Sequence, residues 1–150
     1  MGQRGGSWVI AQVVLFILFA VAPQIGSPWP GADIFRLFGW ILVIVGVLLF
    51  AQGAIKLGRS LTPFPRPLPD GRLVTTGAYR FVRHPIYSSV VLGALGLSLA
   101  SMSPVRLALT LVLFVFFDLK ARREEQWLQE KYPEYAAYKS RVKKLIPWVY

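Results

Sequence analysis

Four long apolar runs constrain this chain more than any other feature of its sequence. They cover about residues 8–25, 34–56, 85–102 and 104–120 of a 150-residue chain. A helix needs about 20 mostly apolar residues, within a range of about 17–25, to cross a bilayer. With 55% apolar residues and a mean hydropathy of +0.51, the chain is too apolar for an ordinary soluble domain of this size. We therefore expect an all-α integral membrane protein: a single membrane-embedded domain over residues 1–150, with four transmembrane helices and a C-terminal amphipathic helical tail over residues 121–150.

The first run also has some features of a secretory signal peptide. Arg4 precedes it, and Ala20-Val21-Ala22 resembles the small-residue pattern of a cleavage site. Pro23 follows this pattern directly and argues against cleavage. Because three further apolar runs follow, a membrane protein is expected under either reading.

The distribution of charge predicts the orientation of the chain in the membrane. The net charge is +10, and the basic residues concentrate in residues 56–83 and from residue 118 onward. The positive-inside rule places both segments in the cytoplasm. An even number of spans then puts the N-terminus in the cytoplasm as well, in agreement with Arg4. We expect a multi-pass protein with both termini cytoplasmic.

The basic residues and the residue types that are missing exclude several classes of function. Lys and Arg beside apolar runs are explained by membrane topology and by contact with anionic membrane lipids, so no nucleic-acid partner is expected. The chain has no cysteine and one histidine, which exclude thiolate and histidine-rich metal sites. We expect no protein-bound metal.

A proline-rich segment connects the second and third apolar runs. Pro63, Pro65, Pro67 and Pro69 alternate along it, and such a pattern lacks backbone donors and favours an extended path. A stiff loop of this kind suits a wall or lid over a pocket, and it suits a spacer equally well.

Two polar clusters lie where the third and fourth apolar runs meet the charged segments. The connection over residues 101–104 is very short, so these runs should form an antiparallel hairpin that brings His84 and Tyr87 beside residues 120–125. Pro85 starts a helix whose first N–H groups, flanked by Arg83 and His84, suit a bound carboxylate.

The second cluster holds a cation and a carboxylate on one side of a helix. Lys120 and Glu124 are four residues apart and share a helix face, where they can hold a polar ligand by opposite ends. Taken alone, Glu124 and Glu125 are better explained as solvated partners of Arg122 and Arg123, and it is the spacing to Lys120 that favours a site.

Four segments together resemble the isoprenylcysteine carboxyl methyltransferase family, which is related to the membrane phospholipid N-methyltransferases. They are Leu73-Val74-Thr75-Thr76-Gly77-Ala78-Tyr79, Arg83-His84-Pro85-Ile86-Tyr87, Glu124-Glu125-Gln126-Trp127-Leu128 and Glu134-Tyr135-Ala136-Ala137-Tyr138 with Arg141, Val142 and Pro147. The similarity covers about residues 69–147 in the family's order, whereas the first two runs carry no motif.

The resemblance implies a membrane-embedded methyltransferase that uses S-adenosyl-L-methionine. It also implies a cytoplasmic cofactor pocket under the proline-rich loop and a lipophilic substrate that enters from the bilayer. By position, the implied cofactor-binding residues are Gly71, Arg72, Leu73, Val74, Tyr79, His84, Pro85, Ile86, Tyr87 and Glu124, and the chemistry of the helix start adds Arg83. Lys120 stands where the family has a substrate-contacting arginine, and lysine lacks the two-pronged grip of arginine on a carboxylate. Ser88-Ser89 replaces a usual glycine after the histidine-proline motif and keeps small side chains there.

The class of acceptor decides which residues act in catalysis. A carboxylate is already ionised and needs only an orienting cation such as Lys120, whereas an amine must first lose a proton to a base such as His84 or Glu125. We favour O-methylation of a prenyl-like or lipid-tailed carboxylate, with a phospholipid or amine N-methyltransferase as the alternative.

Two further functions remain as alternatives. Residues 131–150 are also similar to the C-terminus of NADPH-dependent membrane sterol reductases, which are much longer. A non-enzymatic membrane protein that binds lipids would explain the charges and the apolar runs, but not the ordered motifs.

Overall fold

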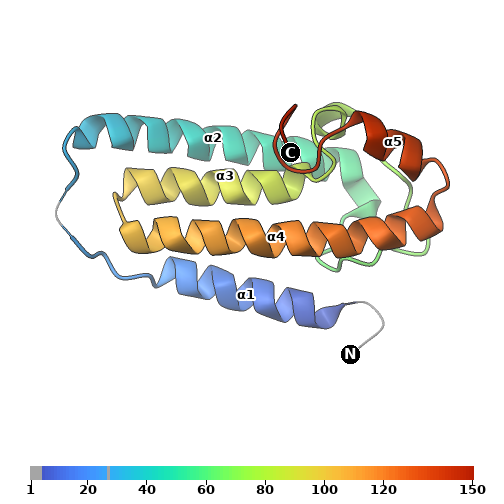
Figure 1. The fold of residues 1–150 in the computed structure, drawn as a ribbon, viewed down its shortest axis with the longest axis horizontal. Helices are drawn as coiled ribbons and strands as arrows, with labels where there is room; N and C mark the ends of the chain where they lie inside the picture. The colour runs from blue at the N-terminus through green and yellow to red at the C-terminus, as the bar shows by residue number, and fades with distance from the viewer. Residues whose placement is uncertain (1–4, 27) are drawn as a thin grey trace.

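In a computed structural model that describes residues 5–26 and 28–150, all regular secondary structure is helical (Figure 1). Arg4, on which part of the predicted orientation depends, lies outside these residues. The elements are α1 (Gly6–Ala20), α2 (Ala32–Leu57), η1 (Gly58–Ser60), η2 (Gly77–Arg80), α3 (Pro85–Ala100), α4 (Pro104–Lys131) and α5 (Tyr135–Arg141), where η denotes a short 3₁₀ helix. The expected all-α class is confirmed.

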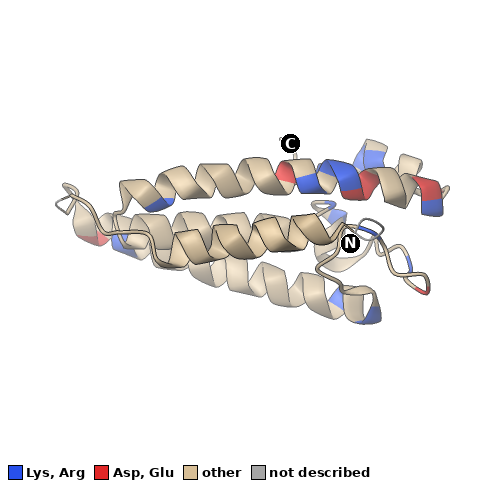
Figure 2. Ribbon diagram, turned by 90° about the horizontal axis from the view of Figure 1, so that it is seen from below, with Lys and Arg blue, Asp and Glu red and all other residues tan. Residues whose placement is uncertain are grey.

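The four long helices lie side by side, with α3 between α2 and α4 and with α1 on the other side of α4 (Figure 1). The loop after α2, helix α5 and the C-terminal segment gather at the end of the bundle where α3 begins. Most of the charged residues lie at this same end (Figure 2). The fold therefore separates an apolar bundle from a charged end.

Glycines on one face of α2 allow α3 to pack closely against it. Gly39, Gly46 and Gly53 are the buried residues of α2, and their seven-residue spacing keeps them on one face. A Cβ atom added at Gly39 would lie 2.5 Å from the carbonyl oxygen of Gly96, and one at Gly46 would lie 3.0 Å from that of Ser89. Any larger side chain would push the two helices apart.

The helix bounds differ from the expected spans at several points. Helix α1 ends at Ala20, five residues before the expected end, because Pro23 follows and cannot continue a helix. Helix α4 continues without a break to Lys131, so the expected division at residue 120 between a span and a tail helix does not exist. Helix α5 has only seven residues and is the last helix, so the expected helical tail over residues 121–150 is not helical throughout.

One helical stretch of the described chain, Ala32–Ser60, is long and apolar enough to cross a membrane by length and composition, with a mean hydropathy of 2.5. Gly6–Ala20 and Pro85–Ala100 are shorter apolar helices. Helix α4 is long, but Arg106, Asp118 and Lys120 interrupt its apolar part. The count of four spans therefore stays a prediction.

Candidate functional site

A pocket of about 450 Å³ lies at the charged end of the bundle, between the proline-rich loop and the facing ends of α3 and α4. Ten of the residues expected from the sequence line it: Arg72, Leu73, Val74, Tyr79, Arg83, His84, Ile86, Tyr87, Lys120 and Glu124. The other three, Gly71, Pro85 and Glu125, are not among its lining residues. The predicted meeting of the two polar clusters is thus present in the structure.

Helix α4 holds the proline-rich loop in place by bonding to its carbonyl groups. Lys120 donates a hydrogen bond of 2.9 Å to the carbonyl of Pro63, and Lys131 donates to the carbonyls of Leu68 and Pro69. The hydroxyl of Tyr132 donates to the carbonyl of Gly71 at 2.5 Å. Because the prolines of this loop have no N–H to pair, donors from another element suffice to hold it. The loop forms a fixed wall of the pocket, and the carbonyl of Gly71 is one of the points where it is anchored.

The C-terminal segment fixes the start of α3. The N–H groups of Arg83 and His84 donate to the carbonyls of Lys143 and Lys144, at 2.8 and 3.1 Å. His84 immediately precedes the helix, which begins at Pro85, and its ring is stacked on that of Tyr87 with a centroid separation of 5.3 Å. These contacts hold the imidazole at the pocket wall.

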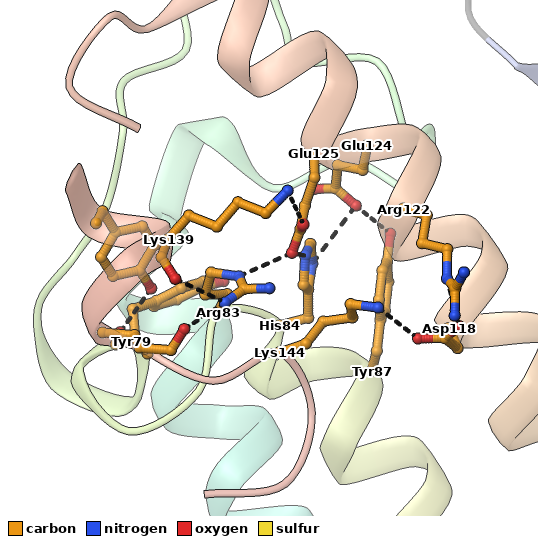
Figure 3. A network of polar contacts seen from close by, with 12 residues as sticks. Tyr79, Arg83, His84, Tyr87, Asp118, Arg122, Glu124, Glu125, Lys139 and Lys144 are labelled. Atoms are coloured by element: carbon orange, nitrogen blue, oxygen red, sulfur yellow. Dashed lines mark hydrogen bonds and ion pairs between the residues drawn. The ribbon is translucent and has the colours of Figure 1, made fainter. Parts of the chain in front are cut away.

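Glu125 is the centre of a buried ion cluster behind His84 (Figure 3). Its side chain is 4% exposed, and one carboxylate oxygen lies 2.8 Å from Nε of Arg83 and 3.2 Å from Nε2 of His84. Nζ of Lys139 lies 3.1 Å from the other oxygen. Burial opposes ionisation of this carboxyl, but the hydrogen bonds from His84 and Arg83 outweigh it and hold the pKa of Glu125 well below its usual range.

This environment does not suit Glu125 to the role of a base that was considered from the sequence. A carboxylate with a strongly lowered pKa is a weak proton acceptor, and Glu125 does not line the pocket. Arg83 is also committed, because it donates to the carbonyls of Lys139 and Val142 in addition to Glu125. These contacts suit both residues to holding His84 in position, and Arg83 also lines the pocket.

Glu124, next to Glu125 in the sequence, faces the pocket instead. One of its oxygens accepts a 2.5 Å hydrogen bond from the hydroxyl of Tyr87 and lies 3.8 Å from Nδ1 of His84 (Figure 3). Its side chain is 25% exposed, so it can accept further hydrogen bonds from a ligand. The alternative of solvated pairs with Arg122 and Arg123 is not observed: Arg122 pairs with Asp118, and Arg123 with Gln126.

Lys120 is a buried cation in the pocket wall. It is 1% exposed, and its Nζ donates to the side-chain oxygen of Gln12 at 2.5 Å and to the carbonyl of Pro63. Within the described residues no carboxylate lies at ion-pair distance from it. Since an ammonium group has three N–H donors, one donor beyond these two bonds remains for a ligand, and Nζ lies 5.3 Å from the centroid of the Tyr87 ring.

Several pocket residues were missed in the sequence. Those outside the expected set are Gln12, Phe16, Phe50, Leu57, Leu61, Thr62, Pro63, Val90, Phe117, Leu128, Tyr135 and Tyr138. Gln12 carried a usable signal, because an amide within an apolar run is a functional candidate by its position alone. Tyr135 and Tyr138 are buried, and burial raises the pKa of both hydroxyls. Tyr138 donates to the carbonyl of Tyr79 at 2.6 Å, which joins the tail to the pocket.

No group of three or more His, Cys, Asp or Glu side chains that could hold a metal ion occurs in the part of the chain that the structure describes. The pocket instead combines four tyrosines, one carboxylate, one imidazole, two guanidinium groups and one buried ammonium group. Such a site can bind a ligand that carries both a cation and an anion.

Sequence comparisons associate the chain with known methyltransferases. The family model of phospholipid methyltransferases matches residues 34–135. Protein-S-isoprenylcysteine O-methyltransferase B of Arabidopsis thaliana is 31% identical over 144 residues, which cover 93% of this chain and 68% of that protein. A probable enzyme of the same kind from Oryza sativa subsp. indica is 32% identical over 115 residues, covering 74% of this chain and 60% of that protein.

The cobalt-zinc-cadmium resistance protein CzcN of Cupriavidus metallidurans is 39% identical over 149 residues, covering 97% of this chain and 64% of that protein. The solved structure of the eukaryotic intramembrane Ras methyltransferase, isoprenylcysteine carboxyl methyltransferase, superposes with a TM-score of 0.72 at 23% identity. That match covers 98% of this chain and 54% of the other, and it shows a shared fold. The chain thus spans roughly 54–68% of the lengths of these four proteins.

Proposed function

Because the chain belongs to the phospholipid methyltransferase family and is related to the isoprenylcysteine O-methyltransferases, we propose that it is a membrane-embedded transferase that uses S-adenosylmethionine to methylate a lipophilic acceptor. The observation that carries the proposal is a single pocket that is lined by Glu124, His84, four tyrosines and the buried cation Lys120.

The residues of the pocket fit the chemistry of this cofactor, which carries a sulfonium, an ammonium and a carboxylate group. The rings of Tyr79, Tyr87, Tyr135 and Tyr138 line the pocket, and aromatic faces attract sulfur and nitrogen cations. Glu124 would accept hydrogen bonds from the ammonium group or from ribose hydroxyls. A volume of about 450 Å³ is within the usual range for ligand sites.

The bound cofactor would supply an activated methyl group, which passes to the acceptor as the methyl–sulfur bond breaks and leaves a neutral thioether. The chain itself has to align the acceptor and exclude water. Lys120 would orient a carboxylate through its remaining N–H, and such an acceptor needs no base. The loop residues Leu73 and Val74 would cover the reacting groups. For an amine acceptor, His84 is the pocket residue able to take the proton.

We propose a lipid-tailed carboxylic acid as the acceptor, with an S-isoprenylcysteine as the representative class. The positive charge of Lys120 attracts an anion and repels an ammonium group. A lipid-tailed amine remains the alternative, in keeping with the name of the matching family model.

We further propose that α1 to α4 cross the membrane as one domain, with both termini in the cytoplasm. Large apolar side chains such as Ile17, Leu37, Leu48 and Leu111 are exposed along the bundle, and the charges gather mostly at one end (Figure 2). A reporter fused after Tyr150 should therefore be active only in the cytoplasm. Activity on the opposite side of the membrane would contradict this orientation.

The Glu124→Ala substitution should weaken cofactor binding by about ten- to a hundred-fold, because a hydrogen bond to a charged group contributes about 1.5–3 kcal/mol. Calorimetric titration of the purified protein with S-adenosylhomocysteine measures this change. Glu130→Ala on the exposed face of the same helix is the matched control and should bind like the wild type. Unchanged affinity in a folded Glu124→Ala protein would remove this residue from the site.

The function itself is tested by binding and by methyl transfer. We expect the wild type to bind S-adenosylhomocysteine and to transfer labelled methyl groups from S-adenosylmethionine to S-farnesylcysteine in preference to a long-chain amine. Binding of NADPH in place of S-adenosylhomocysteine would instead indicate a sterol-type reductase. Binding of neither would favour a non-enzymatic lipid-binding protein.

A further inference from the structure

We infer that the hydrocarbon tail of the acceptor lies in an apolar groove between α1 and α2, and that Gly93 on the floor of this groove determines how long a tail fits. The inference rests on the proposed function, because it assumes an acceptor whose polar head is at Lys120.

The groove has a volume of about 360 Å³ and continues from the pocket. Phe16 of α1, Phe50 of α2 and Val90 of α3 line both cavities. Helix α1 packs on α4 and α2 packs on α3, so the groove lies between two helices that each have a different partner. Its floor is a stripe of α3 that runs from Val90 to Leu97, which corresponds to about 10 Å along the helix.

The lining of the groove suits hydrocarbon and offers nothing to a polar group. Its walls are aliphatic and phenyl side chains, among them Phe19, Val43 and Leu113. The one side chain with a hydroxyl, Ser89, already donates to the carbonyl of Ile86 at 2.7 Å. The buried ammonium group of Lys120 lines the pocket that opens into this groove. A molecule with an anionic head and an apolar tail therefore matches the two cavities, with its head in the pocket beside Lys120 and its tail in the groove.

Gly93 differs from the neighbouring glycines of the α2–α3 contact. A Cβ atom added at Gly46 or Gly96 would meet the backbone of the other helix, at 3.0 and 2.5 Å respectively. A Cβ atom added at Gly93 would meet nothing within 4 Å. Helix packing thus does not require a glycine at this position, and the space above it belongs to the groove.

The Gly93→Leu substitution would fill this space without opposing the fold, because leucine has a much better helix propensity than glycine. We expect kcat/KM for S-farnesylcysteine to fall by about ten-fold or more. The fall should be intermediate for S-geranylcysteine, and kcat/KM should not change for the shortest acceptor, a cysteine thioether with a single isoprene unit. Affinity for S-adenosylhomocysteine should stay that of the wild type. Ala51→Leu is the matched control: it adds the same side chain on an exposed face of α2 outside both cavities and should leave the length preference unchanged.

A second readout locates the tail without turnover. An S-farnesylcysteine analogue with a photoreactive group at the end of its tail should crosslink to residues 90–97 of the wild type, and much less to Gly93→Leu. Crosslinks confined to the exposed faces of α1 or α2 would mean that the tail lies in bulk lipid and would overturn the inference.

The outcomes separate this inference from the proposed function. An unchanged length preference in Gly93→Leu, or an equal loss for all three acceptors, would overturn the role of Gly93 while methylation by the wild type still supports the function. If the wild type bound no cofactor and methylated nothing, the proposed function would fail, and the crosslinking pattern would still decide whether the groove holds a tail.

Discussion

Replacing Glu125 by alanine should lower the free energy of unfolding by about 3–5 kcal/mol, because removal of one partner from a buried ion pair leaves an uncompensated charge. The side chains of Glu125 and Arg83 are only 4% and 9% exposed, so the guanidinium group would stay largely buried without its carboxylate. Denaturant unfolding in detergent micelles measures the change. The exposed Glu130→Ala, on the same helix, should have almost no effect. A Glu125→Ala protein as stable as this control would show that the cluster contributes nothing to folding.

The same carboxylate should make the stability of the protein sensitive to acid. The pKa of Glu125 is lowered in the folded state, so its contribution is fully present above the unfolded-state pKa of about 4.3 and declines as the pH falls below that value. The stability difference between the wild type and Glu125→Gln should therefore be constant from about pH 5 to pH 6 and shrink below about pH 4. A difference that persisted unchanged in stronger acid would argue against this carboxylate as its source.

The helical class and the meeting of two polar clusters could be predicted because both depend on local patterns. Apolar runs of sufficient length predict the helices. The short turn over residues 101–104 makes the third and fourth runs antiparallel neighbours, so His84 and Glu124 must lie close together. The proline-rich loop was predictable as a stiff element for the same reason, since its backbone lacks donors whatever surrounds it. Its bonds to Lys120 and Lys131, by contrast, depend on where α4 ends.

The parts of the site that could not be predicted depend on the packing of distant segments. Gln12 reaches Lys120 only because α1 packs on α4, and the sequence of α1 does not show which helix the face that carries Gln12 will contact. Glu124 and Glu125 are chemically identical neighbours, and their different roles arise because a helix turns by about 100° per residue. One then faces the pocket and the other faces Arg83 and the tail. The position of the C-terminal tail determines which of the two carboxylates is buried against it and which faces the pocket.

The largest effect on activity should come from Lys120, which is 1% exposed and whose ammonium group lies in the pocket wall without a carboxylate at ion-pair distance among the described residues. Lys120→Met keeps the apolar stem but removes the charge, and we expect kcat/KM for a lipid-tailed carboxylic acid to fall by about 10²–10³, the usual loss when one preorganised donor is removed. Lys120→Arg should restore part of the activity, because the positive charge returns in a side chain that can also bond to Gln12 and to the carboxylate. Affinity for S-adenosylhomocysteine, measured in the same preparations, should stay that of the wild type, which distinguishes a loss of acceptor orientation from a loss of fold.

A lipid-tailed amine is the matched control acceptor. Its methylation by Lys120→Met should fall little or should rise, because the cation that repels the amine is gone. Equal losses for the acid and the amine would mean that Lys120 holds the pocket wall through Gln12 and Pro63 and does not select the acceptor.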